Sequence, residues 1–166
     1  VELLTRGGFL MGFWENKRVV VTGGAGFIGS HLVDNLVTKR QVNQDDIIIP
    51  RSTVYYLRLL EDCLRALDGA DIVLHLAGTV GSIEYNRNNP GSQYYDCNLI
   101  NLQVLEAARQ VGVQRFIGVS CVCAYPRDAS YPLREETMFQ GPPEDSHFGY
   151  GFAKRQMIVQ AEAYRS

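Results

Sequence analysis

Short apolar runs alternate along the chain with longer segments in which apolar residues recur at helical spacing. Runs rich in β-branched residues are typical of buried strands, and they occupy residues 17–22, 46–50, 71–77 and 115–120. Apolar residues three or four positions apart predict helices over residues 27–38, 57–67, 94–111 and 149–165. Residues 131–148 are rich in proline, glycine and acidic residues, so we expect a loop there.

Strands separated by helices of this length imply right-handed βαβ crossovers and a parallel sheet. The sequence therefore predicts an α/β fold, a Rossmann-like, doubly wound parallel sheet with helices on both faces, over residues 11–166. Residues 1–10 do not join this pattern, and the stretch from Met11 onward looks like a natural beginning. We expect a leader or a disordered segment over residues 1–10, with a structural arm as the alternative.

Composition narrows the class of protein. The 166 residues are 46% hydrophobic and 20% charged, which fits one globular domain with a real core. The net charge of −2 and the lack of a basic run give no reason to expect nucleic acid as a partner. No apolar stretch approaches the roughly eighteen residues that a membrane-spanning helix needs. Four cysteines without CxxC spacing and three scattered histidines indicate a reduced, cytoplasmic protein with no metal site.

A glycine-rich turn joins the first predicted strand to the first helix. Gly23, Gly26 and Gly29 fit the spacing GxxGxxG in a strand–turn–helix context, which such a motif requires. The first glycine allows the tight turn, the second lets the backbone approach a pyrophosphate, and the third lets the helix pack closely on the sheet. Because a helix begins there with free N–H groups, we expect a dinucleotide to bind by its phosphates. The alternative is a turn that only connects strand and helix.

The residues after the second predicted strand bear on which dinucleotide binds. Sites that prefer NAD usually have an acidic residue there, which holds the ribose 2′-hydroxyl. Here Arg51 and Ser52 follow the strand, and the nearby acidic residues precede it. A cation and a hydroxyl suit a 2′-phosphate, so we expect NADP, with NAD as the alternative. A solvent-facing loop arginine would explain the same residue without any ligand.

Tyr150 and Lys154 stand four residues apart at the start of the last predicted helix. Residues at this spacing share a helix face, so the phenol and the ammonium can point the same way. A tyrosine with its ordinary pKa of about 10 is a poor base at neutral pH, and a nearby cation lowers that pKa toward the working range. The pair is therefore a candidate general acid/base, although tyrosine and lysine also meet at this spacing by coincidence.

Four segments together resemble one family of enzymes. TGGAGFIGS, DIVLHLAG, SCVCAYP and YGFAK are similar to the motifs of extended short-chain dehydrogenases/reductases, in the NAD(P)-dependent nucleotide-sugar epimerase/dehydratase branch. The resemblance covers residues 17–166. Within the branch, Cys123 two residues before Tyr125-Pro126, and the stretch 80–83, are similar to the GDP-fucose synthases and GDP-mannose 3,5-epimerases.

The resemblance implies roles for individual residues. Tyr150 would be the general acid/base at the reacting sugar hydroxyl or carbonyl, and Lys154 would hold the nicotinamide ribose and tune Tyr150. Cys123 would protonate or deprotonate a sugar carbon next to a ketone; a small buried side chain at a strand end is the alternative. Further cofactor contacts are implied for Phe27, Ile28, Leu76, Ala77, Gly78 and Asn98.

Three departures from the family pattern stand out. The catalytic serine or threonine expected four residues before Tyr125 is Cys121, with Ser120 one place earlier, so either residue could complete the catalytic set. Tyr56 stands where an aspartate often lies beside the adenine. The chain also stops after the helix of Tyr150, so we expect the C-terminal substrate subdomain and its histidine acid/base to be missing.

We therefore expect an NADP-dependent nucleotide-sugar epimerase/reductase that acts on a GDP-4-keto-6-deoxy sugar. The alternatives are a UDP-sugar 4-epimerase or dehydratase with internally recycled NAD, and a truncated, non-catalytic NAD(P)-binding module. The family also implies a homodimer through helices 94–111 and 149–165. Apolar residues of these helices could form that interface or belong to the core: Ile100, Val104, Ile158 and Ala161.

Overall fold

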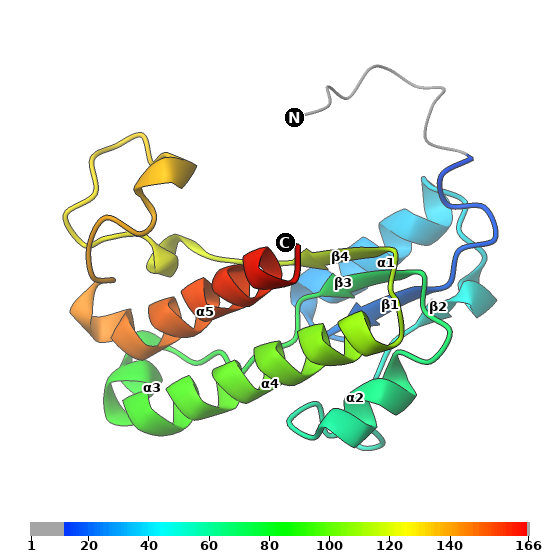
Figure 1. Ribbon diagram of the computed structural model, residues 1–166, viewed down its shortest axis with the longest axis horizontal. Coiled ribbons are helices and arrows are strands. Elements are labelled where there is room, and N and C mark those ends of the chain that lie inside the picture. The colour runs from blue at the N-terminus through cyan, green and yellow to red at the C-terminus, as the bar shows by residue number, and fades with distance from the viewer. Residues whose placement is uncertain (1–11, 166) are drawn as a thin grey trace.

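The computed structural model describes residues 12–165, in which four parallel strands form one sheet with the order β2-β1-β3-β4 (Figure 1). The strands are β1 (Val19–Thr22), β2 (Ile47–Ile48), β3 (Ile72–His75) and β4 (Arg115–Gly118). β1 pairs with β2 on one side and with β3 on the other. The predicted α/β fold with a parallel sheet is confirmed, and the expected leader at residues 1–10 lies outside the described residues.

Within the same residues, the α-helices are α1 (Phe27–Thr38), α2 (Leu60–Ala66), α3 (Ile83–Asn88), α4 (Pro90–Gln110) and α5 (Phe148–Arg165). Short 3-10 turns lie at Gln44–Asp46, Val122–Ala124, Glu135–Thr137 and Asp145–His147. α1 packs on one face of the sheet, α2 and α4 pack on the other, and α5 lies alongside α4 (Figure 1). Helices thus cover both faces, as predicted.

Alternation along β1 divides the core in two. Val19 and Val21 face α1, whereas Val20 points toward α2 and α4, because successive strand residues point to opposite faces. Ile100 and Val104 of α4 lie in the second cluster with Val20. These two residues therefore belong to the core of the chain and not to a surface between two copies.

β2 is two residues long, where the sequence predicts a strand over residues 46–50. Asn43 accepts a hydrogen bond from the N–H of Asp45 and holds Asp46 in a 3-10 turn ahead of the strand. Pro50 has no N–H for the ladder, so the pairing ends early. The second strand is therefore shorter than its apolar run predicts.

Several other predicted bounds shift. α2 begins at Leu60 and not at residue 57, because Asp62 accepts the N–H of Tyr56 and holds the preceding residues in a turn. β4 ends at Gly118 and not at residue 120, since its partner β3 ends at His75. Both differences come from hydrogen bonds that apolar patterning does not reveal.

α4 begins at Pro90, ahead of the predicted residue 94, and α3 was not predicted at all. Proline suits the first turn of a helix, where its missing N–H would have no partner in any case. α3 begins after Ser82, whose hydroxyl accepts the N–H of Tyr85. The predicted loop over residues 131–148 holds, with two 3-10 turns inside it.

β4 forms one edge of the sheet and is less covered than the other strands. Ile117 and Val119 are 49% and 42% exposed. They line an apolar groove of about 310 Å³ together with Trp14, Leu32 and Leu74. The groove lies on the face of the sheet that α1 only partly covers.

Candidate functional site

The glycine turn closes between β1 and α1 as the sequence predicts. Gly23 has a φ of 71°, in the left-handed region that favours glycine. A side chain on Gly29 would overlap the carbonyl oxygen of Gly23, so the helix can approach the turn this closely only with glycine. The first N–H groups of α1 have no partner within the helix, and they offer donors to an anion.

A cavity of about 380 Å³ lies beside this turn and gathers several predicted cofactor residues. Its walls come from the segments that follow β1, β2 and β3, and they include Gly23, Arg51, Ser52, Ala77 and Gly78. No acidic residue in the described part of the chain lines the cavity. None of the ion pairs among residues 12–165 uses Arg51. An anionic group in this cavity would therefore meet an unpaired guanidinium.

Four other residues with implied cofactor contacts lie outside this cavity. Phe27 and Ile28 stand in the first turn of α1 and are 83% and 65% exposed. Leu76 packs with the cluster under α1, so its side chain points away from the cavity. Asn98 donates its amide to the carbonyl of Tyr94 in its own helix. The cavity thus gathers the glycine turn and the segments after β2 and β3, but the side chains of Leu76 and Asn98 do not reach it.

Tyr56 and Arg58 add a feature that the sequence did not predict. The guanidinium carbon of Arg58 lies 4.9 Å from the centre of the Tyr56 ring, and its Nε lies 2.8 Å from a carboxylate oxygen of Asp96 in α4. Both residues line the same cavity as Arg51. They place an aromatic face and a second cation where a flat base could stack.

Tyr150 and Lys154 lie in the first turns of α5, with the ammonium nitrogen 5.7 Å from the centre of the phenol ring. Lys154 is buried and donates a hydrogen bond to the carbonyl of Val119 at 2.9 Å. Burial raises the pKa of Tyr150, and nearby thiols, Cys121 and Cys97 among them, raise it further. The sequence predicted the opposite direction for this pKa, because the neighbouring lysine cation was expected to stabilise the phenolate.

Cys121, Cys97 and Cys123 all lie close enough to Tyr150 to act on its ionisation. Burial and the neighbouring Cys123 raise the pKa of Cys121 to about 11, so this thiol is protonated at neutral pH. The buried hydroxyl of Ser120 has no hydrogen-bond partner in the part of the chain that the structure describes. Ser120 and Cys121 line one cavity together with Tyr125, so both stay candidates for the catalytic hydroxyl position.

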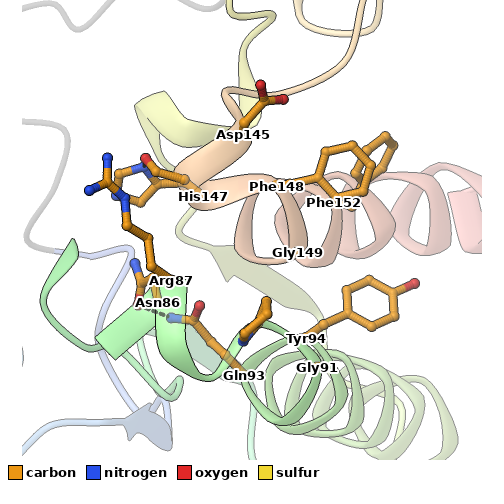
Figure 2. Close-up of a pocket in the computed structure, with 12 residues that line it drawn as sticks. Asn86, Arg87, Gly91, Gln93, Tyr94, Asp145, His147, Phe148, Gly149 and Phe152 are labelled. Carbon is orange, nitrogen blue, oxygen red and sulfur yellow. Dashed lines mark hydrogen bonds between the residues drawn. The ribbon is translucent and has the colours of Figure 1, made fainter. Parts of the chain in front are cut away.

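A larger cavity, of about 630 Å³, lies between α3, the start of α4 and the start of α5 (Figure 2). Figure 2 shows Arg87 and His147 on one side of this cavity and the paired rings of Phe148 and Phe152 on the other, with Tyr94 contributed by α4. Neither member of the tyrosine–lysine pair lines this cavity. Gly149, the residue before Tyr150, does line it.

A glycine turn after the first strand of a parallel sheet is where α/β proteins of the dinucleotide-binding class hold their ligand, and this chain has that architecture. Residues 19–166 match the NAD dependent epimerase/dehydratase family. The chain belongs to that family, which agrees with the resemblance found in its motifs.

Curated relatives of this chain bear the names of GDP-sugar enzymes. A probable GDP-L-fucose synthase of Drosophila melanogaster is 33% identical over 151 residues, which cover 89% of this chain and 46% of that protein. GDP-mannose 3,5-epimerase 1 of Oryza sativa subsp. japonica is 30% identical over 159 residues, which cover 86% of this chain and 41% of that protein. The chain thus spans about half the length of the curated relatives it matches.

Solved structures share the fold. A GDP-L-fucose synthetase from Naegleria fowleri bound to NADP has a TM-score of 0.78 at 27% identity, over 91% of this chain and 45% of that one. UDP-glucose 4-epimerase of Thermus thermophilus, in complex with NAD, has a TM-score of 0.67 at 26% identity, over 89% of this chain and 50% of that one. The likeness extends across the sheet and the helices that carry the candidate site.

Three further observations concern residues 12–165 alone. None of their helices is long and apolar enough to cross a membrane. They contain no group of three or more His, Cys, Asp or Glu side chains placed to hold a metal ion. Cys63, Cys97, Cys121 and Cys123 are free thiols.

Proposed function

We propose that the chain carries the cofactor-binding and proton-transfer residues of an NADP-dependent nucleotide-sugar epimerase/reductase that acts on a GDP-4-keto-6-deoxy sugar. The observation that carries this proposal is the cavity that joins the glycine turn to Arg51 and Ser52. The names of the relatives, GDP-L-fucose synthase and GDP-mannose 3,5-epimerase, support a GDP-sugar as the substrate. The activity of the whole protein is part of the proposal, since this chain spans about half of those relatives.

The residues around the cavity fit NADP. Its pyrophosphate would lie at the glycine turn against the first N–H groups of α1, where a side chain on Gly29 would overlap the backbone. Arg51 and Ser52 would bind the 2′-phosphate, and the Tyr56 ring, backed by Arg58, would stack on the adenine. Bound NADPH supplies the hydride that reduces a sugar ketone.

Tyr150 and Lys154 would serve proton transfer and orientation. A phenol with a raised pKa keeps its proton at neutral pH and can donate it to an oxygen atom that gains negative charge. Lys154 would hold the nicotinamide ribose from its buried position in α5. Cys123 would move a proton at the sugar carbon next to the ketone, with Cys121 in the place of the usual hydroxyl.

Two alternatives account for less of the structure. A UDP-sugar 4-epimerase or dehydratase with recycled NAD is suggested by the likeness to the Thermus thermophilus enzyme. NAD sites usually hold the 2′-hydroxyl with an acidic residue, however, and none of the described acidic residues lines this cavity. A non-catalytic NAD(P)-binding module would need the glycine turn but not Tyr150 placed close to a buried Lys154.

We further propose that two copies associate through the outer faces of α4 and α5. Ala161 is exposed and Ile158 is half-buried, whereas Ile100 and Val104 are core residues and cannot contribute. The same two helices expose large side chains that a partner would cover: Tyr95, Val159 and Tyr164. Sedimentation should show a dimer that Val159→Asp dissociates, and a monomeric wild-type chain would rule this association out.

Thermal melting with NADP⁺, with NAD⁺ and without ligand tests the proposal. A ligand at about a hundred times its dissociation constant stabilises a protein by roughly 2.7 kcal/mol, which raises the Tm by several degrees. We expect such a shift with NADP⁺ and a smaller one with NAD⁺. Arg51→Ala should remove the preference for NADP⁺, and Arg40→Ala, at an exposed position after α1, should keep it.

Each other outcome of this melting experiment has a definite meaning. A larger shift with NAD⁺ than with NADP⁺ would favour the enzymes that recycle NAD within one reaction cycle. No shift with either dinucleotide, in a protein that melts cooperatively, would overturn dinucleotide binding by this chain.

A further inference from the structure

A chain of buried hydrogen bonds crosses the core from the end of β1 to α5. The hydroxyl oxygen of Thr22 lies 2.7 Å from Nδ1 of His75, and Nε2 of His75 lies 3.1 Å from Oδ1 of Asn101. The amide nitrogen of Asn101 donates to the carbonyl of Ala153 at 3.1 Å. Thr22, His75 and Asn101 are at most 1% exposed, so water does not replace these partners.

One arrangement of protons gives every group in this series of hydrogen bonds a partner. The amide N–H of Asn101 is used on Ala153, so the amide oxygen accepts from Nε2–H of His75. Nδ1 of His75 then carries no proton and accepts from the hydroxyl of Thr22, whose oxygen in turn accepts the N–H of Ala77. The imidazole is neutral in this arrangement, and burial lowers the pKa of His75 to about 4.

The main chain of His75 leads to Lys154 by a second route. The carbonyl of His75 accepts the N–H of Val119 at 3.1 Å, and the carbonyl of Val119 accepts the ammonium of Lys154 at 2.9 Å. Ala153, where the first route ends, is the residue before Lys154 in α5. The two routes close a ring that holds Lys154 both at its backbone and at its charged end.

We propose that His75 and Asn101 are positioning residues that fix Lys154 where it meets the nicotinamide half of the dinucleotide. Neither of them lines the dinucleotide cavity, so they act through Lys154 and not on the ligand. A buried polar group that loses its partner costs more free energy than the bond itself contributes, and the ring therefore favours a single geometry. The inference rests on the proposed function, in which Lys154 holds the nicotinamide ribose.

Calorimetric titration with two ligands separates positioning from general stability. NADP⁺ extends from the glycine turn to Lys154, whereas adenosine 2′,5′-bisphosphate has no nicotinamide half and stays near the turn. We expect Asn101→Leu to weaken NADP⁺ binding about tenfold and to change the bisphosphate affinity by less than about twofold. A purely structural loss would weaken both ligands alike.

Gln160→Leu is the matched control for this variant. Gln160 also links α5 to α4 by a buried amide, which donates to the carbonyl of Leu102 at 3.1 Å, but it lies outside the ring. Both ligand affinities should therefore stay unchanged. His75→Phe removes the side-chain route and keeps the main-chain route, so it should match Asn101→Leu, and the double variant should be no weaker than either single one.

A measurement on the unaltered chain tests the ring without any variant. Nitrogen NMR of the imidazole at about pH 6 should show a neutral His75 with its proton on Nε2. A proton on Nδ1, or the same ratio of the two affinities in wild type and in both variants, would overturn the inference while leaving the proposed function intact. If wild type binds neither ligand, the proposed function fails and takes this inference with it.

Discussion

The ammonium of Lys154 donates to the carbonyl of Val119 at 2.9 Å and lies over the ring of Tyr150, not at its hydroxyl. A cation over the ring stabilises a phenolate less than a cation beside the oxygen, because the negative charge is largest on that oxygen. Burial and the nearby thiols, Cys121 first among them, hold the pKa of Tyr150 above its ordinary value. In this geometry the phenol of Tyr150 keeps its proton at neutral pH.

Tyr150 should ionise later than an exposed tyrosine while the chain is folded. The number of tyrosines that ionise can be followed by ultraviolet absorbance. Up to about pH 11, folded wild type and folded Tyr150→Phe should form the same number of phenolates. When both chains are unfolded in urea, wild type should form one more phenolate than the variant. Because the unfolded chain loses this proton first, stability should also fall above about pH 10. One extra phenolate in folded wild type at that pH would contradict the buried, protonated phenol.

Acid should destabilise the fold through His75. Its folded pKa of about 4 lies below the ordinary 6.5, so the unfolded chain takes up the proton first as the pH falls. The contribution of His75 is complete above about pH 7 and is lost between about pH 6.5 and 4, by roughly 3 kcal/mol in total. The free energy of unfolding, measured in urea at several pH values, should depend less on pH in His75→Phe than in wild type. The same pH dependence in both proteins would count against a neutral His75.

Gly29→Ala and Gly91→Ala should have opposite effects on stability, although both glycines stand in the first turn of a helix. A Cβ on Gly29 would overlap the backbone of Gly23 and Gly24, whereas nothing lies within 4 Å of one on Gly91. We expect the first variant to lose more than about 2 kcal/mol and the second to gain up to about 1 kcal/mol, since alanine is the better helix former. Urea unfolding measures both, and similar losses would show that the turn tolerates a side chain.

Cys63 and Cys121 should resist alkylation at about pH 8. Burial raises the pKa of Cys63 to about 12, and burial together with Cys123 raises the pKa of Cys121 to about 11. The thiolate is the reactive form, and at this pH roughly one molecule in a thousand or fewer carries it at either position. Peptide mapping after iodoacetamide treatment should show that both are alkylated much more slowly than a cysteine in a short peptide. If Cys121 were alkylated as fast as that reference cysteine, its thiol would be exposed to water.

Features with local causes could be predicted from the sequence. The helix expected over residues 27–38 has the same bounds as α1, because the glycine turn fixes its start and apolar spacing marks its length. Arg51, Ser52, Ala77 and Gly78 meet in one cavity because parallel strands end at the same edge of a sheet. α3 was missed because it is short and is set by the cap at Ser82, which apolar patterning does not register.

Features with distant partners could not be predicted in the same way. Val119 and Lys154 are 35 residues apart in sequence, and His75 and Asn101 are 26 apart. Apolar periodicity does not reveal such pairs, so the lysine was expected to act on Tyr150 and to lower its pKa. Leu76 is different, because strand alternation alone places it opposite His75 and away from the cavity.

Val119 follows β4, the outer strand of the sheet, and is 42% exposed, yet its carbonyl holds the ammonium of Lys154. The ammonium of Lys154 is thus held at the edge of the sheet and not at its centre. The position of the Lys154 ammonium therefore depends on the backbone of a partly exposed residue and not on one in the core.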